Sequence, residues 1–256
     1  MRPLGAGREI VPGVRVTEHL HRSNHLDVYA AHDERRLAAV VVKAPRPDRL
    51  RDAAVVRQLL REGRLLRRLA HPHVVRAYDV VREPRPAIVL ETVGGETLRH
   101  LFSRVRLGAS DLRELGAQLA SAVGCLHAEG ILHLDLKPSN VIADCGRAKL
   151  LDLSIAQRPG RVSKGRGTWL NMAPEQAAGG IVGPAADVWG IGTVLWEGAT
   201  GEGPFDDRDQ SEERAAPVRE LRPRLPKALA AAIDACLEPD AARRPGVPEL
   251  ARALAT

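Results

Sequence analysis

The chain has 256 residues, of which 44% are hydrophobic and 27% charged, and its formal net charge is +6 at pH 7. This length suffices for one large or two small domains, and the composition is that of a soluble globular protein, without internal repeats or low-complexity tracts. The three cysteines (Cys125, Cys145 and Cys236) lack metal-site spacing, which argues against a cysteine metal site and indicates reduced thiols in an intracellular protein.

Neither a signal peptide nor a membrane span is expected. The first seven residues have no apolar core of the kind that a signal peptide requires. The most apolar stretch, residues 188–199, is too short to cross a bilayer and carries Glu197. We therefore expect a cytoplasmic protein with no membrane segment of its own.

The first part of the chain predicts a β-rich region with one long helix. Three β-branched stretches, at 14–16, 28–30 and 39–43, predict antiparallel strands. A helix is expected from about Arg51 to Leu69, because His71-Pro72 follows. Two further strands are expected at 74–81 and 87–91, after which Gly94-Gly95 breaks the chain.

The helix expected at 51–69 carries a carboxylate on its apolar face. At about 100° per residue, one stripe contains Val55, Leu59, Leu65, Leu66 and Leu69. Glu62 falls within this stripe, and a buried carboxylate is costly unless a cation meets it. Lys43, at the end of an apolar strand, is the available cation. The alternative is that Glu62 is a rim charge and Lys43 only a solubilising strand end.

The same helix carries several arginines that raise the question of nucleic-acid binding. They are Arg57, Arg61, Arg64, Arg67 and Arg68. No aromatic residues accompany them, so stacking on single strands is not supported. A solvated helix face explains them better, and we expect no nucleic-acid partner.

The rest of the chain predicts mainly helices. They are expected at 111–127, 186–199, 227–237 and 247–254. Asp111 with Glu114 has the character of a capping box at the start of the first of these helices. The apolar residues of 186–199 lie all round the helix, which predicts a buried position.

Two short polar segments carry the chemistry. The first is His133-Leu134-Asp135-Leu136-Lys137-Pro138-Ser139-Asn140, and the second is Asp152-Leu153-Ser154. A carboxylate can orient a hydroxyl, an ammonium can neutralise a transferring phosphoryl group, and the oxygens of Asn140 and Asp152 can hold magnesium. A polar hairpin between two strands would explain only the turn chemistry of 138–140.

These segments resemble the catalytic and metal-binding loops of the protein kinase family. Further along, Gly167 to Glu175 resembles the end of a kinase activation segment, and Ala186 to Gly192 the start of the central buried helix. Arg244-Pro245 resembles the late arginine that pairs with Glu175. The resemblance implies an α+β, two-lobed fold in a single domain, 1–256. Its small β-rich N-lobe with one helix would cover about 1–93, and its larger, mainly helical C-lobe about 94–256.

The resemblance also implies roles for individual residues. Asp135 would accept the proton of the substrate hydroxyl, and Lys137 would stabilise the γ-phosphoryl group of ATP. Asn140 and Asp152 would bind Mg²⁺, and Lys43, held by Glu62, would fix the α- and β-phosphates. Lys137 with Thr168 matches the pair that flanks the catalytic aspartate in serine/threonine kinases. The remaining nucleotide contacts would come from Leu20, Val28, Val41, Glu91, Val93 and Ile142.

Three departures from the family pattern bear on mechanism. The glycine positions of the nucleotide-covering loop fall on His21, Ser23 and Leu26, so backbone amides lose their close approach to phosphates. Val41 also replaces a small alanine above the adenine. In the magnesium loop, Leu153 and Ser154 stand where phenylalanine and glycine are usual. Leu134 replaces the arginine that normally reads an activation-loop phosphate.

The favoured function is a bacterial-type Ser/Thr protein kinase that uses ATP and Mg²⁺ on a protein substrate. A pseudokinase, a binding module with weak or no phosphotransfer, is the main alternative. A small-molecule phosphotransferase of related fold is disfavoured by Met172 to Glu175 and by Lys137-Pro138. With a glycine-free lid we expect weak ATP binding, for which His21, Arg22 and His25 are the available side-chain donors.

Overall fold

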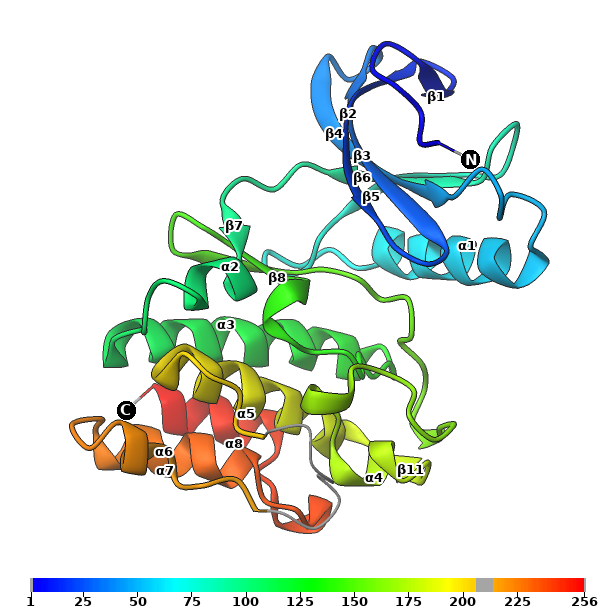
Figure 1. Ribbon diagram of the computed structural model, residues 1–256. Coiled ribbons are helices and arrows are strands. Elements are labelled where there is room, and N and C mark those ends of the chain that lie inside the picture. Colours follow the sequence, from blue (N-terminus) through cyan, green and yellow to red (C-terminus); the bar gives the residue numbers. More distant parts are fainter. Residues whose placement is uncertain (1, 206–213, 256) are drawn as a thin grey trace. The chain divides into compact units, whose positions relative to one another are not determined.

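The computed structural model describes residues 2–205 and 214–255, which form two compact units (Figure 1). One unit comprises the chain up to Val93 together with Asp152–Ser154. The other comprises Gly94–Leu151 and the residues from Ile155 onward. No helix in the described part of the chain is long and apolar enough to cross a membrane.

The first unit is an antiparallel six-stranded sheet with one helix (Figure 1). Its strands are β1 (Glu9–Val11), β2 (Val14–Arg22), β3 (Leu26–Asp33), β4 (Ala38–Pro45), β5 (Ala77–Val81) and β6 (Ala87–Glu91). They are ordered β1-β2-β3-β4-β6-β5, and helix α1 (Ala53–Arg68) packs against β4, β5 and β6. The predicted strands are therefore confirmed as parts of β2 to β6.

An apolar core of the first unit includes the N-terminal strand. Ile10 and Val11 of β1 are buried with Tyr29, Val40 and Val42 of the neighbouring strands. Sequence patterning missed β1 because it has only three residues. The expected strand at 74–81 begins only at Ala77, although the preceding valines are buried.

Helix α1 confirms the expected apolar stripe with one adjustment. Asp52 caps the helix by accepting hydrogen bonds from the backbone N–H groups of Ala54 and Val55. Val55, Leu59 and Leu66 are buried, whereas Leu65 is only half-buried. Gly63 allows the helix to approach the sheet closely, since an added Cβ would lie 2.9 Å from side-chain atoms of Ile88 and Val80.

The second unit is mainly helical. Its helices are α2 (Leu98–Phe102), α3 (Ala109–Ala128), α4 (Pro174–Ala177), α5 (Pro184–Thr200), α6 (Val218–Leu221), α7 (Lys227–Cys236) and α8 (Val247–Leu254). Short 3₁₀ turns lie at η1 (Pro138–Asn140), η2 (Trp169–Asn171) and η3 (Ala241–Arg243). The four helices expected in this part of the chain correspond to α3, α5, α7 and α8. Every residue of α5 from Ala186 to Thr200 is buried, which confirms its central position.

Short strands complete the second unit. β7 (Glu96–Thr97), β8 (Val141–Asp144) and β9 (Arg147–Leu150) form one small sheet, and β10 (Gly160–Arg161) pairs with β11 (Ile181–Val182). Pairs this short escaped the sequence analysis because two to four residues show no usable alternation. The hairpin of β8 and β9 links the two polar segments singled out in the sequence.

The predicted capping box at the start of α3 is wrong. The helix begins two residues earlier, with Gly108 at the N-cap, so Asp111 lies within the first turn and caps nothing. Leu112 is fully buried, and the helix has to be formed before it to place that side chain in the core. Asp111 still stabilises the positive end of the helix dipole.

A buried ion pair links distant segments of the second unit. The guanidinium of Arg244 donates from Nη1 and Nη2 to the two carboxylate oxygens of Glu175, at 2.8 and 2.9 Å. It also donates to backbone carbonyls, including that of Ala185, and its carbon lies 4.9 Å from the ring centroid of Trp189. The pairing expected from the sequence is thus confirmed.

We predict that Arg244→Ala lowers the free energy of unfolding by roughly 3 kcal/mol, because it leaves Glu175 and several carbonyls without a donor. Arg244→Lys should recover only part of the lost stability, since an ammonium cannot form the bidentate contact with the carboxylate. Urea denaturation measures both. Arg243→Ala is the matched control, because Arg243 is exposed and 3.9 Å from its nearest carboxylate. Equal losses for the two alanine variants would contradict the prediction.

Candidate functional site

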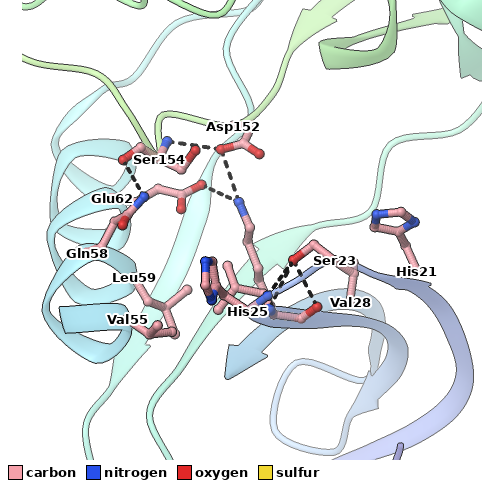
Figure 2. Close-up of a pocket in the computed structure, with 12 residues that line it drawn as sticks. His21, Ser23, His25, Val28, Val55, Gln58, Leu59, Glu62, Asp152 and Ser154 are labelled. Atoms are coloured by element: carbon pink, nitrogen blue, oxygen red, sulfur yellow. Dashed lines mark hydrogen bonds and ion pairs between the residues drawn. The ribbon is translucent and has the colours of Figure 1, made fainter. Parts of the chain in front are cut away.

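One ammonium and two carboxylates form the centre of the site in the first unit. Lys43 lies on β4, opposite Val28 of β3. Its Nζ is 2.8 Å from Glu62 Oε1 and 3.2 Å from Asp152 Oδ1. Dashed lines in Figure 2 mark the ion pairs at Glu62 and Asp152. Glu62 is 2% exposed and Lys43 9% exposed, so the pair is buried as the apolar stripe predicted. The alternative of a rim charge and a solubilising lysine is wrong.

The three charges shift one another's pKa values. Burial, together with the nearby charge of Asp152, raises the pKa of Glu62 to about 7, even though Lys43 opposes the shift. Burial alone would raise the pKa of Asp152, but Lys43 and the hydrogen bonds from Ser154 hold it well below its usual range. Although burial opposes it, the two carboxylates raise the pKa of Lys43. Near neutral pH the lysine and Asp152 are therefore charged, while Glu62 titrates.

The segment Asp152–Ser154 is held by local hydrogen bonds. Asp152 has a left-handed backbone with φ of 55°, and its Oδ1 accepts a hydrogen bond from the Ser154 amide at 2.9 Å. The Ser154 carbonyl accepts from Gln58 Nε2 of α1 at 3.1 Å. Leu153 is buried. Serine in place of glycine is thus accommodated, because the strained residue is Asp152.

A pocket of about 270 Å³ surrounds these charges (Figure 2). Its lining residues are His21, Ser23, His25, Leu26, Val28, Lys43, Val55, Gln58, Leu59, Glu62, Asp152 and Ser154. The β2–β3 hairpin, which is the expected nucleotide lid, supplies the first five of them. The pocket thus offers one permanent cation to an anionic ligand, and its floor carries a carboxylate suited to a hard metal ion.

The structure corrects the expected role of Arg22. Its guanidinium makes a bidentate pair with Asp27, at 2.7 Å from Nε and 2.9 Å from Nη2. Asp27 is completely buried and also accepts hydrogen bonds from His19 and Tyr29. Arg22 therefore binds within the lid hairpin. The sequence could not reveal this pairing, because the register of β2 and β3 is what places Arg22 opposite Asp27.

Side chains of the first polar segment, which is expected to form the catalytic loop, converge with Thr168 on one carboxylate of the second unit. Asp135 Oδ1 accepts a hydrogen bond from Thr168 Oγ1 at 2.7 Å. Asp135 Oδ2 lies 2.8 Å from Lys137 Nζ and 2.9 Å from Asn140 Nδ2. Lys137 Nζ also donates to Thr168 Oγ1. Four side chains expected from the motif are thus joined in one network, which fixes the orientation of the carboxylate.

A buried aspartate missed by the sequence analysis organises this loop. Asp187, at the start of α5, accepts hydrogen bonds from the backbone N–H groups of His133 and Leu134 at 2.9 and 2.8 Å. His127 Nε2 lies 2.8 Å from the same carboxylate. Leu134 is buried with a left-handed φ of 65°, which these bonds compensate. A carboxylate at the start of an otherwise apolar helix was the signal that could have identified it.

The expected adenine-contacting residues are found in both units. Leu20, Val28 and Val41 lie on the neighbouring strands β2, β3 and β4, and Leu20 is 50% exposed. Glu91 ends β6, and its carboxylate accepts a hydrogen bond from the Arg76 amide at 2.8 Å.

Two of these residues lie beyond the strands of the first unit. Val93 follows β6 and is half-buried. Ile142 lies on β8 of the second unit, opposite Thr97 of β7. The nucleotide contacts of both residues remain predictions.

The residues expected to hold magnesium fit a hard, water-retaining cation. Asn140 directs its Nδ2 to Asp135, which leaves the amide oxygen as a ligand. Asp152 is ionised across the physiological pH range, as a metal ligand must be. Magnesium typically binds through one or two carboxylates plus substrate phosphates, so a larger cluster of protein ligands is not required.

Comparison with known proteins identifies the family. The sequence matches the protein kinase domain family over residues 20–254. It is 34% identical over 234 residues to the serine/threonine-protein kinase PkaA of Streptomyces coelicolor, which covers 84% of this chain and 42% of PkaA. It is 35% identical over 231 residues to the probable serine/threonine-protein kinase PkwA of Thermomonospora curvata, covering 85% of this chain and 30% of PkwA. The chain thus spans less than half the length of these two relatives.

A solved structure gives the same result for the fold. The kinase domain of PknI from Mycobacterium tuberculosis matches with a TM-score of 0.78, 24% sequence identity and coverage of 99% of both chains. This similarity confirms the α+β kinase fold expected from the sequence.

We predict that Lys43→Met lowers the free energy of unfolding by roughly 3 kcal/mol, because two carboxylates lose their cation. The double variant Lys43→Met, Glu62→Leu should regain most of that loss, since an apolar pair suits the site. A double-mutant cycle measured by urea denaturation at a pH above 8, where Glu62 is ionised, gives the coupling free energy. A coupling of zero would show that the ion pair contributes nothing.

The raised pKa of Glu62 predicts a specific pH dependence of stability. In the window from its ordinary pKa of 4.5 up to about 7, the folded chain holds a proton that the unfolded chain has lost. The stabilisation is complete below this window and disappears as the pH rises through it. The melting temperature of the wild type relative to Glu62→Gln should therefore fall by a few degrees from about pH 5 to about pH 8.

Glu18→Gln serves as the control for this measurement, because Glu18 is an exposed carboxylate on β2 of the same unit. It should show no such change relative to the wild type. A pH-independent difference for Glu62→Gln would mean that Glu62 is already ionised well below neutral pH.

Proposed function

We propose that this chain, which belongs to the protein kinase family, transfers the γ-phosphoryl group of ATP to serine or threonine hydroxyls of a protein. The observation that carries the proposal is the network around Asp135, in which Lys137, Asn140 and Thr168 each contact the carboxylate. A scaffold without phosphotransfer has no need to hold a carboxylate by three side-chain donors, one of them an ammonium. The network supports the serine/threonine class because it contains both Lys137 and Thr168.

Asp135 orients the substrate hydroxyl and takes up its proton. Because Thr168 and Asn140 bind one oxygen each, the carboxylate cannot rotate freely, and the hydroxyl meets it in a fixed direction. Orientation is most of what the protein can contribute, since phosphoryl transfer depends mainly on positioning and charge stabilisation.

Lys137 and Lys43 supply positive charge to different parts of the nucleotide. Lys137, beside Asp135, would neutralise charge on the transferring group as the oxygen attacks. Lys43, held by Glu62, would bind the α- and β-phosphates. Asn140 and Asp152 would hold magnesium, which when bound neutralises charge on the phosphate oxygens.

Leu134 sets this chain apart in its regulation. A buried leucine has no guanidinium, so the catalytic loop offers no bidentate contact to an activation-segment phosphate at this position. The loop is instead ordered by Asp187, through two backbone hydrogen bonds that need no phosphate. We therefore expect the catalytic loop to be formed without prior phosphorylation.

Transfer of labelled phosphate from ATP–Mg²⁺, to the chain itself and to generic protein substrates, tests the proposal. Asp135→Asn should lower the rate at least ~100-fold, because the amide cannot accept the proton, and the melting temperature should hardly change. Asp144→Asn, on β8 and outside the network, should leave the rate unaltered. Failure of the wild type to transfer phosphate while it still binds ATP would favour the pseudokinase alternative.

A further inference from the structure

The tip of the lid uses its own backbone amides. The amide of Ser23 donates to the carbonyl of Leu26 at 2.8 Å. The amides of His25 and Leu26 donate to Ser23 Oγ at 3.3 and 3.0 Å. Three of the amides at the tip are therefore satisfied within the turn and not presented to a ligand.

Side chains outside the tip hold this closed turn in place. Arg46, at the end of β4, donates from Nη1 to the carbonyls of Ser23 and Asn24, and its amide donates to the carbonyl of His25. At the base of the lid, Arg22 is bound to Asp27. Contacts at the tip and at the base of the lid therefore stabilise the turn in which the tip amides are occupied.

Two imidazoles remain as donors on the pocket side of the lid. His21 and His25 both line the pocket that contains Lys43, and Figure 2 draws them with Lys43 among the lining side chains. Both residues are exposed, and within the described part of the chain neither ring has a hydrogen-bond partner. Arg22 is excluded because its guanidinium is committed to Asp27.

We infer that the imidazoles of His21 and His25 make the lid's contacts to the phosphates of the bound nucleotide in place of backbone amides. The inference rests on the proposed function, because it concerns the same ATP site. Its consequence is that removing both imidazoles weakens the binding of a nucleotide with phosphates but not the binding of a nucleoside without them.

Other charged groups around the pocket set the background for this effect. Lys43 and Asp152 keep their charges across the physiological pH range, whereas Glu62 titrates near neutral pH. On the lid side, Arg22 is paired with Asp27, and Arg46 with Asp48. His19 is bound to the buried Asp27. Protonation of Glu62 would favour an anionic ligand at low pH, so the histidines have to be isolated by substitution.

Isothermal titration calorimetry with the full chain separates these contributions. ATP–Mg²⁺ and adenosine are each titrated at one fixed pH into the wild type, His21→Gln, His25→Gln and the double variant. His32→Gln is the matched control, because His32 is an exposed histidine on β3 that does not line the pocket. Titration of the nucleotide and of Glu62 cancels when variant and wild type are compared at one pH.

The double variant should bind ATP–Mg²⁺ about tenfold more weakly than the wild type. Adenosine affinity and the His32→Gln control should be unchanged. An equal loss for adenosine, no loss at all, or no nucleotide binding by the wild type would each overturn the inference.

Phosphate transfer measured on the same samples distinguishes this failure from failure of the proposed function. A wild type that transfers phosphate but loses no ATP affinity when both histidines are replaced overturns only the inference. A wild type whose ATP affinity depends on the histidines as expected but that transfers no phosphate supports the inference and overturns the kinase activity.

Discussion

The first unit depends on a single ammonium that two carboxylates share. Lys43 lies within 3.2 Å of both Glu62 and Asp152, in a region largely withdrawn from water. One cation against two anions leaves an excess of negative charge, which is costly at low dielectric. The raised pKa of Glu62 is one response to that excess. A divalent cation on Asp152 would be another, so metal binding and the protonation of Glu62 are expected to be linked.

The second unit uses buried carboxylates in a different way. Within the part of the chain that the structure describes, Asp187 contacts no lysine or arginine. It accepts hydrogen bonds from the loop backbone, which holds Leu134 in a left-handed conformation. Asp135 is held by side chains, one of which is the ammonium of Lys137. Asp187, which orders a loop, is thus bound by backbone amides. Asp135, which would meet the substrate, is bound mainly by side chains.

Much of the site could be predicted from the sequence because it depends on local patterns. The pairing of Lys43 with Glu62 follows from a carboxylate on an apolar helical stripe, and the network around Asp135 follows from motif spacing. The lid could not be predicted, since the closed turn at Ser23 and the binding of Arg22 to Asp27 depend on strand register and on side-chain geometry. The start of α3 was predicted wrongly for a related reason, because the burial of Leu112 outweighs the local capping signal of Asp111.

The most direct test of the account is a crystal structure of the chain with a non-hydrolysable ATP analogue and Mg²⁺. The account predicts that Lys43 stays bound to Glu62 while it contacts the α- and β-phosphates, and that Mg²⁺ is coordinated by Asn140 and Asp152. It also predicts that the amides at the lid tip remain within their turn. A nucleotide bound without metal and away from Lys43, or a lid whose amides turn to the phosphates, would contradict it.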